Sequence, residues 1–465
     1  MVYNSGDNNN IGKHERRMIV LGIITMWVLS VIKEVSIGRI RVLGVWILLY
    51  ALGISQRQVV MQIGVLGGMY NRDNVIVNME GYIYIISILL MLGYMRGEGK
   101  KREEGWEMEM EVVLLSIMGM VLLIWSYDLV STYLGIELQS LALYMMTSRS
   151  GDGKGAIAGI KYYILGILSS SILLLGIVMM YQGMGTTHNE GIRMMQETGG
   201  MEIEKIGGRL MISGILFKLA LPPFHNWGPD VYDGVETRIT SWIAVMGKVS
   251  YMIYIYKVRI YEMGMIEGVI IGALVIGSVM GLTQNRIKRL LAYSTINQMG
   301  FQLIGLLTTG VISRVSYIFY NVQYWITLVN SFSIMIALGG RYDIRYISSL
   351  YREAPVLLMA LVINIYSLVG IPPLMGFFGK QMIISGGLLG GYVGIVTIGI
   401  ITSVISGAYY LRVIKEIMLK REEKRRERRE EGGAVTWVIS IITLLTVFYG
   451  VNPRLIMLPI TIMVS

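Results

Sequence analysis

The chain has 465 residues, of which 54% are hydrophobic and 15% charged, with a mean hydropathy of +0.58 and a net charge of +10. A soluble domain carries about 25% charged residues, so this composition excludes a sizeable soluble domain and predicts an all-α polytopic membrane protein. The chain lacks cysteine, which excludes disulfides, iron–sulfur clusters and thiolate metal sites, and its basic residues lie in loops between apolar stretches, which argues against nucleic acid binding.

About fourteen stretches are apolar enough to be transmembrane helices, since a span takes about 20 residues. The first 17 residues are polar, and the run after them is typical of a span and not of a cleavable signal. The stretch 58–70 is apolar but short, so we interpret it as a loop or partial helix. The predicted spans are 17–33, 40–54, 79–95, 112–127, 129–147, 157–181, 208–230 (broken), 239–256, 265–283, 288–309, 315–339, 354–385 (broken), 392–418 and 434–451.

Basic residues gather in alternate loops between these spans. The loops after the odd-numbered spans hold more lysine and arginine than the opposite side, which includes both termini. The positive-inside rule then places those loops in the matrix or cytoplasm and both termini outside. Two charged runs, at 100–111 and 420–431, are either contacts with lipids or partners or solvated segments with interleaved ion pairs.

Two predicted spans are interrupted by paired prolines, Pro222–Pro223 and Pro372–Pro373. Proline removes a helix donor and clashes with the preceding turn, and broken helices in corresponding places of two halves are typical of inverted-repeat transporters. Lys218 lies four residues before the first break, and Lys380 lies seven residues after the second. Free backbone groups at such breaks can bind water at membrane depth.

Four ionisable side chains lie inside apolar stretches: Glu137, Lys218, Lys248 and Lys380. A charge at the bilayer centre costs about 2.5–3.5 kcal/mol on insertion scales, so the pattern indicates an ion or proton pathway. A carboxyl at Glu137 close to Lys218 would titrate with it as a coupled pair. The alternatives are a structural hydrogen bond from a protonated Glu137 and, for Lys248, snorkelling to the interface, which is difficult from about ten residues inside a span.

Polar side chains elsewhere could support a proton path. His225 follows the first break directly and is either a relay or a cap of the second half-helix. Between Lys248 and Lys380 lie hydroxyl and amide groups that can order water by hydrogen bonding. These are Ser294, Thr295, Asn297, Gln298, Tyr317, Asn321, Gln323 and Tyr324. Lys161 and Arg412 lie near helix ends, where they serve proton uptake and release or anchor the helices at the interface.

Several motifs together resemble one known family. GIELQSLALY contains Glu137, FKLALPPFHNWGPDVYDG contains Lys218, and GIPPLMGFFGKQ contains Lys380, with KYYILG and NRIKRLLAYSTINQMGF between them. In this order and spacing they resemble the antiporter-like subunits of proton-pumping NADH:ubiquinone oxidoreductase (respiratory complex I), over residues 112–415. The ELQSL and PDVY forms are similar to the subunit 2 (N) type.

The resemblance implies a fold of fourteen helices with two inverted five-helix repeats and two broken helices. Residues 1–111 would hold helices 1–3, residues 112–260 the first repeat (helices 4–8), residues 261–420 the second repeat (helices 9–13), and residues 421–465 a charged loop and the last helix. It also implies a place beside other membrane-arm subunits, including a neighbouring antiporter-like subunit and a small hydrophobic subunit, and in contact with membrane lipids.

The resemblance further implies that the chain translocates protons. Glu137 corresponds to the family's glutamate on helix 5, Lys218 and Lys248 to its lysines on helices 7 and 8, and Lys380 to its lysine on helix 12. It implies no cofactor or metal on this chain, with NADH, FMN, iron–sulfur clusters and ubiquinone bound by other subunits of the NADH:ubiquinone reductase.

The chain departs from the family pattern at three places. Gln298 stands where members of this type often carry histidine, so a proton-carrying role there would pass to water. The usual alanine-proline-threonine-proline reads VETR at 235–238, where a Glu236–Arg238 contact could replace the stiffness of proline. Asn226 replaces an apolar residue. None of these changes removes a proposed proton carrier.

Two other functions and two locations are compatible with the sequence. A cation/proton antiporter of the Mrp type would keep all four embedded charges, and a structural membrane scaffold would merely pair them; a quinone-binding enzyme lacks a recognisable pocket. The bias towards 56 Gly and 34 Met against 8 Phe and 8 Pro is typical of purine-rich codons and a strand-biased organelle genome. We therefore expect the mitochondrial inner membrane, with the bacterial plasma membrane as the alternative.

Overall fold

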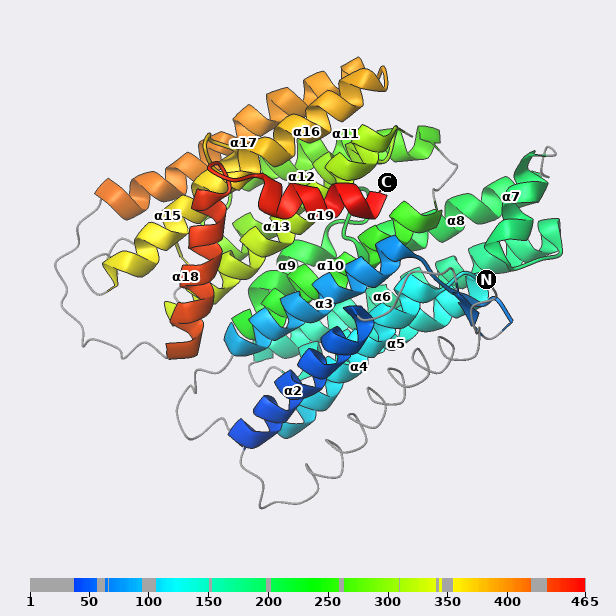
Figure 1. The fold of residues 1–465 in the computed structure, drawn as a ribbon, viewed down its shortest axis with the longest axis horizontal. Coiled ribbons are helices and arrows are strands. Elements are labelled where there is room, and N and C mark those ends of the chain that lie inside the picture. Colours follow the sequence, from blue (N-terminus) through cyan, green and yellow to red (C-terminus); the bar gives the residue numbers. More distant parts are fainter. Residues whose placement is uncertain are drawn as a thin grey trace, which may run out of the picture. The chain divides into compact units, whose positions relative to one another are not determined.

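The structure is a computed structural model, and helices make up nearly all of the part that it describes (Figure 1). This part consists of residues 37–56, 63–65, 67–93, 106–149, 153–197, 202–258, 263–308, 310–339, 343–344, 354–419 and 433–464. It contains seventeen helices and one two-stranded hairpin. The prediction of a helical protein is confirmed.

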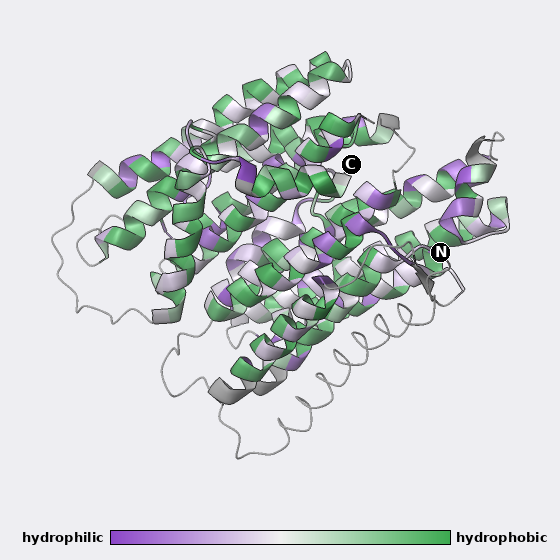
Figure 2. Ribbon diagram, viewed as in Figure 1, coloured by the Kyte–Doolittle hydropathy of each residue, from purple (hydrophilic) through white to green (hydrophobic). Residues whose placement is uncertain are grey.

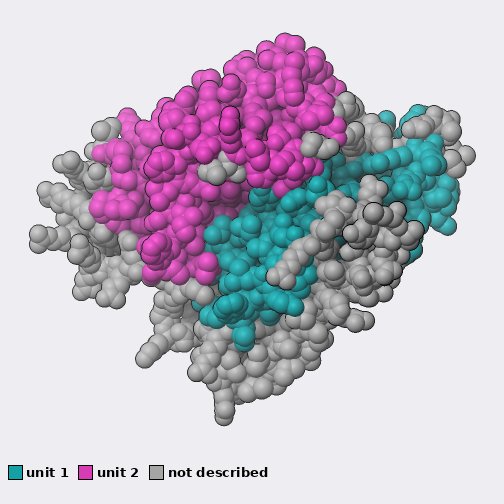
Figure 3. Space-filling view, in the orientation of Figure 1, with its two compact units in different colours: residues 1–91, 97–218, 246–260 teal, residues 92–96, 219–245, 261–465 magenta. Residues whose placement is uncertain are grey.

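The chain divides into two compact units, coloured separately in Figure 3. The first comprises residues 1–91, 97–218 and 246–260. Its elements are α2 (Ile37–Gln56), β1 (Ile63–Val65), β2 (Tyr70–Arg72), α3 (Asn74–Gly93) up to residue 91, α4 (Trp106–Trp125), α5 (Leu129–Ser148), α6 (Gly153–Met184), α7 (Asn189–Glu197), α8 (Glu202–Lys218) and the second part of α10 (Thr237–Val258).

The second unit comprises residues 92–96, 219–245 and 261–465. Its elements are α9 (Trp227–Gly234), the first part of α10, α11 (Met263–Leu282), α12 (Ile287–Ile304), α13 (Val311–Ala337), α15 (Pro355–Val369), α16 (Met375–Leu389), α17 (Val393–Leu419), α18 (Gly433–Phe448) and α19 (Arg454–Val464). The two proline pairs lie between α8 and α9 and between α15 and α16.

In Figure 2, most helices carry much green, the colour of hydrophobic residues. Over the described residues, four helices are long and apolar enough to cross a membrane: Asn74–Gly93, Gly153–Met184, Met265–Leu282 and Val393–Met418. Every predicted span from 40–54 onward overlaps a helix or a pair of helices. The first predicted span, 17–33, and most of the two charged runs lie outside the described residues.

The stretch 58–70, interpreted as a loop or partial helix, is where the sequence prediction is wrong. Its described residues form part of an antiparallel hairpin in which Ile63 of β1 lies opposite Arg72 of β2. Gly67 and Gly68 have φ of 67° and 89°, a region that glycine adopts without steric cost. The two glycines therefore allow the chain to reverse direction between β1 and β2.

Glycines also let helices of the first unit approach one another closely. A Cβ atom at Gly119 of α4 would lie 2.5 Å from the backbone nitrogen of Gln139 on α5, and one at Gly176 of α6 would lie 2.5 Å from that of Met211 on α8. Only glycine fits at such distances. The α4–α5 contact fixes the part of α5 around Gln139, two residues after Glu137.

Candidate functional site

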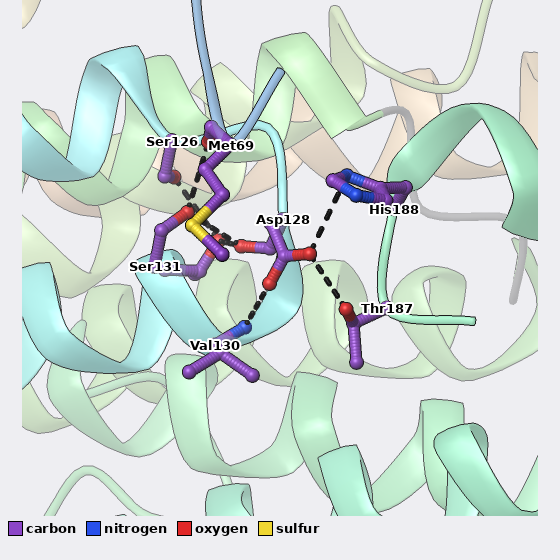
Figure 4. Close-up of polar contacts among 8 residues, drawn as sticks. Met69, Ser126, Asp128, Val130, Ser131, Thr187 and His188 are labelled. Carbon is purple, nitrogen blue, oxygen red and sulfur yellow. Dashed lines mark hydrogen bonds and ion pairs between the residues drawn. The ribbon is translucent and has the colours of Figure 1, made fainter. Parts of the chain in front are cut away.

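The helix that carries Glu137, α5, is anchored at its first turn by Asp128 (Figure 4). One carboxylate oxygen of Asp128 accepts a hydrogen bond from the backbone nitrogen of Val130 at 2.8 Å, which is an N-cap. The other oxygen accepts from the Thr187 hydroxyl at 2.6 Å and lies 3.4 Å from Nδ1 of His188. The start of α5 is thereby tied to the segment that follows α6.

Glu137 lies in the middle of α5, is partly buried, and has one buried carboxyl oxygen that accepts no hydrogen bond from the described residues. Its Oε1 is shielded from solvent and has no partner among the described residues. The carboxyl group interacts electrostatically with Lys218 on α8 and Tyr251 on α10. A buried carboxyl oxygen without a hydrogen-bond donor is rare in native structures, which makes Glu137 a candidate functional group.

Lys218, the last residue of α8, is held by neutral oxygens. Its ammonium donates to the hydroxyls of Tyr144 and Ser170 at 2.9 Å each and to the carbonyl oxygen of Gly166 at 3.4 Å. Within the described residues, no carboxylate lies within ion-pair distance of it, so Glu137 acts on Lys218 through space and not by direct contact. The Lys218 ammonium is thus hydrogen-bonded, but no carboxylate in the described part of the chain contacts it.

Lys248 lies on α10, which is fastened to α5 beside Glu137. The Ser250 hydroxyl donates to Oε1 of Gln139 at 2.7 Å, and Nε2 of Gln139 lies 3.5 Å from the carbonyl oxygen of Met246. Lys248 is only 2% exposed. The first unit therefore brings together Glu137 and Lys218 and aligns the helix that carries Lys248 with them.

Lys380 lies on α16 of the second unit, beside the second proline break. Its ammonium donates to the carbonyl oxygen of Val369, the last residue of α15, at 2.8 Å and lies 5.5 Å from the centre of the Phe301 ring. Gly370 ends α15 with φ of 90°, and a Cβ there would lie 3.0 Å from the Lys380 side chain. The broken helix thus supplies both the acceptor and the space for this lysine.

Gln298 of α12 is fixed next to the same break. Its side-chain oxygen accepts a hydrogen bond from the Tyr320 hydroxyl of α13, and its Nε2 donates to the carbonyl oxygen of Leu368 at 3.3 Å. That carbonyl precedes the one that binds Lys380. Gln298 stands where the family pattern often has histidine. It therefore places a side-chain amide, hydrogen-bonded to Tyr320, beside the break that holds Lys380, the proposed proton carrier.

The remaining predicted relay residues lie in two places in the second unit. Ser294 on α12 lies 2.5 Å from the hydroxyl of Tyr410 on α17, and Asn297 and Tyr324 are buried on α12 and α13. His225 lies between α8 and α9, and its Nδ1 is buried without a hydrogen bond among the described residues.

Comparison with known proteins decides the family. A family model described as NADH:quinone oxidoreductase/Mrp antiporter, TM, matches residues 126–406, which include all four embedded charges. NADH-ubiquinone oxidoreductase chain 2 of Rhizopus oryzae is 33% identical over 86% of this chain and 85% of its own length. The chain belongs to the NADH:quinone oxidoreductase/Mrp antiporter family. NADH-quinone oxidoreductase subunit N of Rhodospirillum rubrum is 31% identical over 86% of this chain and 85% of its own length, so the chain is of the N type.

The structure of this chain also resembles a solved structure in its fold. A chain of the structure "Respiratory complex I from Thermus thermophilus with bound Aureothin" superimposes with a TM-score of 0.81, covering 95% of this chain and 98% of that chain at 24% identity. At this identity the likeness concerns the fold.

Sequence reasoning missed several buried polar residues of this antiporter-family chain. Glu80 of α3 accepts hydrogen bonds from Arg72 at 2.7 Å, Tyr84 at 2.9 Å and Trp125 at 3.1 Å. Lys288, the first residue of the predicted span 288–309, is 1% exposed and donates to the carbonyl oxygen of Val235 at 2.6 Å. A lone acid at the start of a predicted span was the available signal for Glu80; Lys288 had none, because three basic residues in five are typical of a loop.

Proposed function

We propose that this chain is a proton-translocating membrane-arm subunit of NADH:ubiquinone oxidoreductase. The observation that carries the proposal is the buried Lys218 ammonium, held by neutral oxygens with Glu137 in electrostatic range, in a member of the NADH:quinone oxidoreductase/Mrp antiporter family. A lysine without a contacting counter-ion can gain and lose a proton as the charge around it changes.

We propose one order of proton transfer along the embedded charges. Quinone reduction in other subunits would shift the coupling between Glu137 and Lys218. Lys218 would then pass its proton through Lys248 and water to Lys380, which releases it on one side of the membrane. Because charges interact strongly where water is scarce, moving one proton changes the affinity of the next site.

Buried amides of the second unit support a step through water. Gln302 on α12 and Asn330 on α13 are fully buried, and in the described part of the chain neither side-chain amide has a hydrogen-bond partner. Buried polar groups in native proteins are almost always hydrogen-bonded to protein or to ordered water. We therefore assign bound water to these amides.

The assembly follows from the same assignment. The chain would contain fourteen transmembrane helices with two inverted repeats, in which α8–α9 and α15–α16 are the broken spans. NADH, FMN, iron–sulfur clusters and ubiquinone would bind to other subunits, so this chain would carry no redox centre. Its partners would be a neighbouring antiporter-like subunit and a small hydrophobic subunit in the mitochondrial inner membrane, or their counterparts in a bacterial plasma membrane.

Two substitutions test the proposal in the assembled complex. Glu137→Gln and Lys218→Met should each lower the quinone reduction that is coupled to proton pumping by at least about tenfold, while a native gel still shows the complex with NADH dehydrogenase activity. Glu202→Gln and Lys205→Met are matched controls, because they make the same changes in an exposed ion pair on α8.

Three results would contradict the proposal. Normal turnover and normal proton stoichiometry in both variants would remove the proton-carrying role. Sodium-dependent exchange without NADH would favour the Mrp-type antiporter. Loss of assembly in both variants, with normal coupling in the residual complex, would favour a structural scaffold.

A further inference from the structure

The last turn of α15, at the second proline break, has a hydrogen-bond donor for each of its backbone carbonyls. A helix leaves its last four carbonyls without partners of its own, and in α15 these belong to residues 366–369. The backbone nitrogen of Gly370 donates to the first two at 3.1 Å each, and that of Ile371 donates to the first at 3.2 Å. The carbonyls of Leu368 and Val369 are therefore left for side chains.

Two side chains from other helices bind these remaining carbonyls. Nε2 of Gln298 on α12 donates to the carbonyl of Leu368 at 3.3 Å. The Lys380 ammonium on α16 donates to the carbonyl of Val369 at 2.8 Å. Both carbonyls lie at the negative end of the helix dipole, so either could bind an ammonium. By occupying one of them, Gln298 leaves the other to Lys380.

The Gln298 amide is held in this orientation from its other side. A carbonyl only accepts hydrogen bonds, so the amide nitrogen faces Leu368 and the amide oxygen faces Tyr320 of α13. The Tyr320 hydroxyl donates to that oxygen. Gln298 and Tyr320 are 2% and 1% exposed, so bulk water does not compete for this bond. The hydroxyl of Tyr320 thus fixes which end of the amide meets the break.

The ring of Tyr320 packs beside Lys380 itself. A Cβ atom at Gly379, the residue before Lys380, would lie 2.9 Å from the Tyr320 ring, so glycine lets this ring approach α16. The centres of the Tyr320 and Phe301 rings are 6.4 Å apart, and the Lys380 ammonium lies 5.5 Å from the centre of Phe301. Tyr320 therefore contacts α16 with its ring and Gln298 with its hydroxyl.

We propose that Gln298 and Tyr320 are positioning residues for Lys380; this inference rests on the proposed function. By holding the Leu368 carbonyl they leave the ammonium one hydrogen bond, to Val369, and this bond breaks when Lys380 gives up its proton. A side-chain amide is not among the groups that titrate near neutral pH. Gln298 therefore acts through Lys380 and does not carry the proton itself.

Three substitutions test this role in the assembled complex. Gln298→Leu removes both hydrogen bonds of the amide and should lower proton-coupled quinone reduction by about tenfold, because a misplaced reacting group slows transfer. Tyr320→Phe keeps the ring, removes the donor to Gln298 and should also lower it. Gln298→His should lose less than Gln298→Leu, because a neutral imidazole offers one donor and one acceptor.

Two matched controls make the same changes outside the contacts of Lys380. The amide of Gln284 also donates to a backbone carbonyl, that of Met280, at 3.1 Å, and Tyr181 is an exposed residue of α6. Gln284→Leu and Tyr181→Phe should leave proton-coupled quinone reduction unchanged.

A double variant distinguishes positioning from a general loss of stability. Gln298→Leu/Lys380→Met should lose no more proton-coupled turnover than Lys380→Met alone, because no ammonium is left to position. Independent effects would instead add as free energies of activation, and such additive losses would assign Gln298 a purely structural role and overturn the proposal. If Gln298→Leu does not assemble, the same comparison with Tyr320→Phe decides.

The single variants separate this inference from the proposed function. If Lys380→Met loses coupling while Gln298→Leu and Tyr320→Phe behave as the controls do, the positioning role is wrong and the proposed function stands. If Lys218→Met and Lys380→Met both couple normally, the proposed function and the positioning role are both wrong.

Discussion

The buried ion pair between Arg72 and Glu80 in the first unit shows how much one side chain can contribute to stability. Glu80 is fully buried, and its two oxygens accept hydrogen bonds from three side chains. The guanidinium of Arg72 also lies 4.7 Å from the centre of the Trp125 ring. Removing the carboxylate would leave the Arg72 charge buried without its counter-ion, and breaking a buried pair in this way costs about 3–5 kcal/mol.

Glu80→Gln should therefore lower the free energy of unfolding by about 3–5 kcal/mol. Thermal unfolding of the detergent-purified protein would measure this as a lower midpoint. Glu202→Gln, at the exposed Glu202–Lys205 pair, should change the midpoint little, because surface pairs contribute little. Equal midpoints for the two variants would show that the Arg72–Glu80 pair does not stabilise this unit.

The sequence could predict the charged residues of the site but not the hydroxyls around them. A lone charge such as Lys218 is conspicuous in an apolar run, because burying it is costly. Tyr144 and Ser170 are ordinary residues of apolar helices, and they meet Lys218 only because α6 packs against both α5 and α8. Which groups hold a buried lysine therefore follows from the tertiary structure.

At the scale of elements, length and apolar composition were enough to locate the long helices. The short elements were missed for different reasons. α7 has 9 residues with a polar face, and α19 has 11 residues with Pro459 inside, so neither resembles a span of about 20 residues. The hairpin depends on two glycines with positive φ, whose effect a hydropathy pattern does not register.

Glycine substitutions test the close packing of α6 against α8. Gly176→Ala should destabilise the protein by about 1–3 kcal/mol, because the new methyl group would meet the backbone of α8 at Met211. Gly208→Ala, on α8, meets no atom within 4 Å and should stabilise the helix by about 0.5–1 kcal/mol. Unfolding midpoints that move in the same direction would contradict this account of the interface.

At the scale of the whole molecule, two of the embedded lysines lie close in sequence to a proline break. Lys218 ends α8 directly before the first break, and Lys380 binds the carbonyl of Val369 at the second. The lysine partners differ, however: hydroxyls and a distant carboxyl hold the first, whereas a backbone carbonyl and an aromatic ring accompany the second. This difference in partners favours two lysines that bind the proton one after the other over two lysines with equivalent roles.

A single path through both lysines makes a quantitative prediction. If the proton passes from Lys218 to Lys380, the double variant Lys218→Met/Lys380→Met should lose no more proton-coupled turnover than the more impaired single variant, because a path blocked once is not slowed by a second block. Independent paths would instead give losses in free energy of activation that add, as they do for separate sites. Measuring the proton-to-electron ratio of both single variants and the double variant in the assembled complex distinguishes the two, and additive losses would show that each unit moves its own proton.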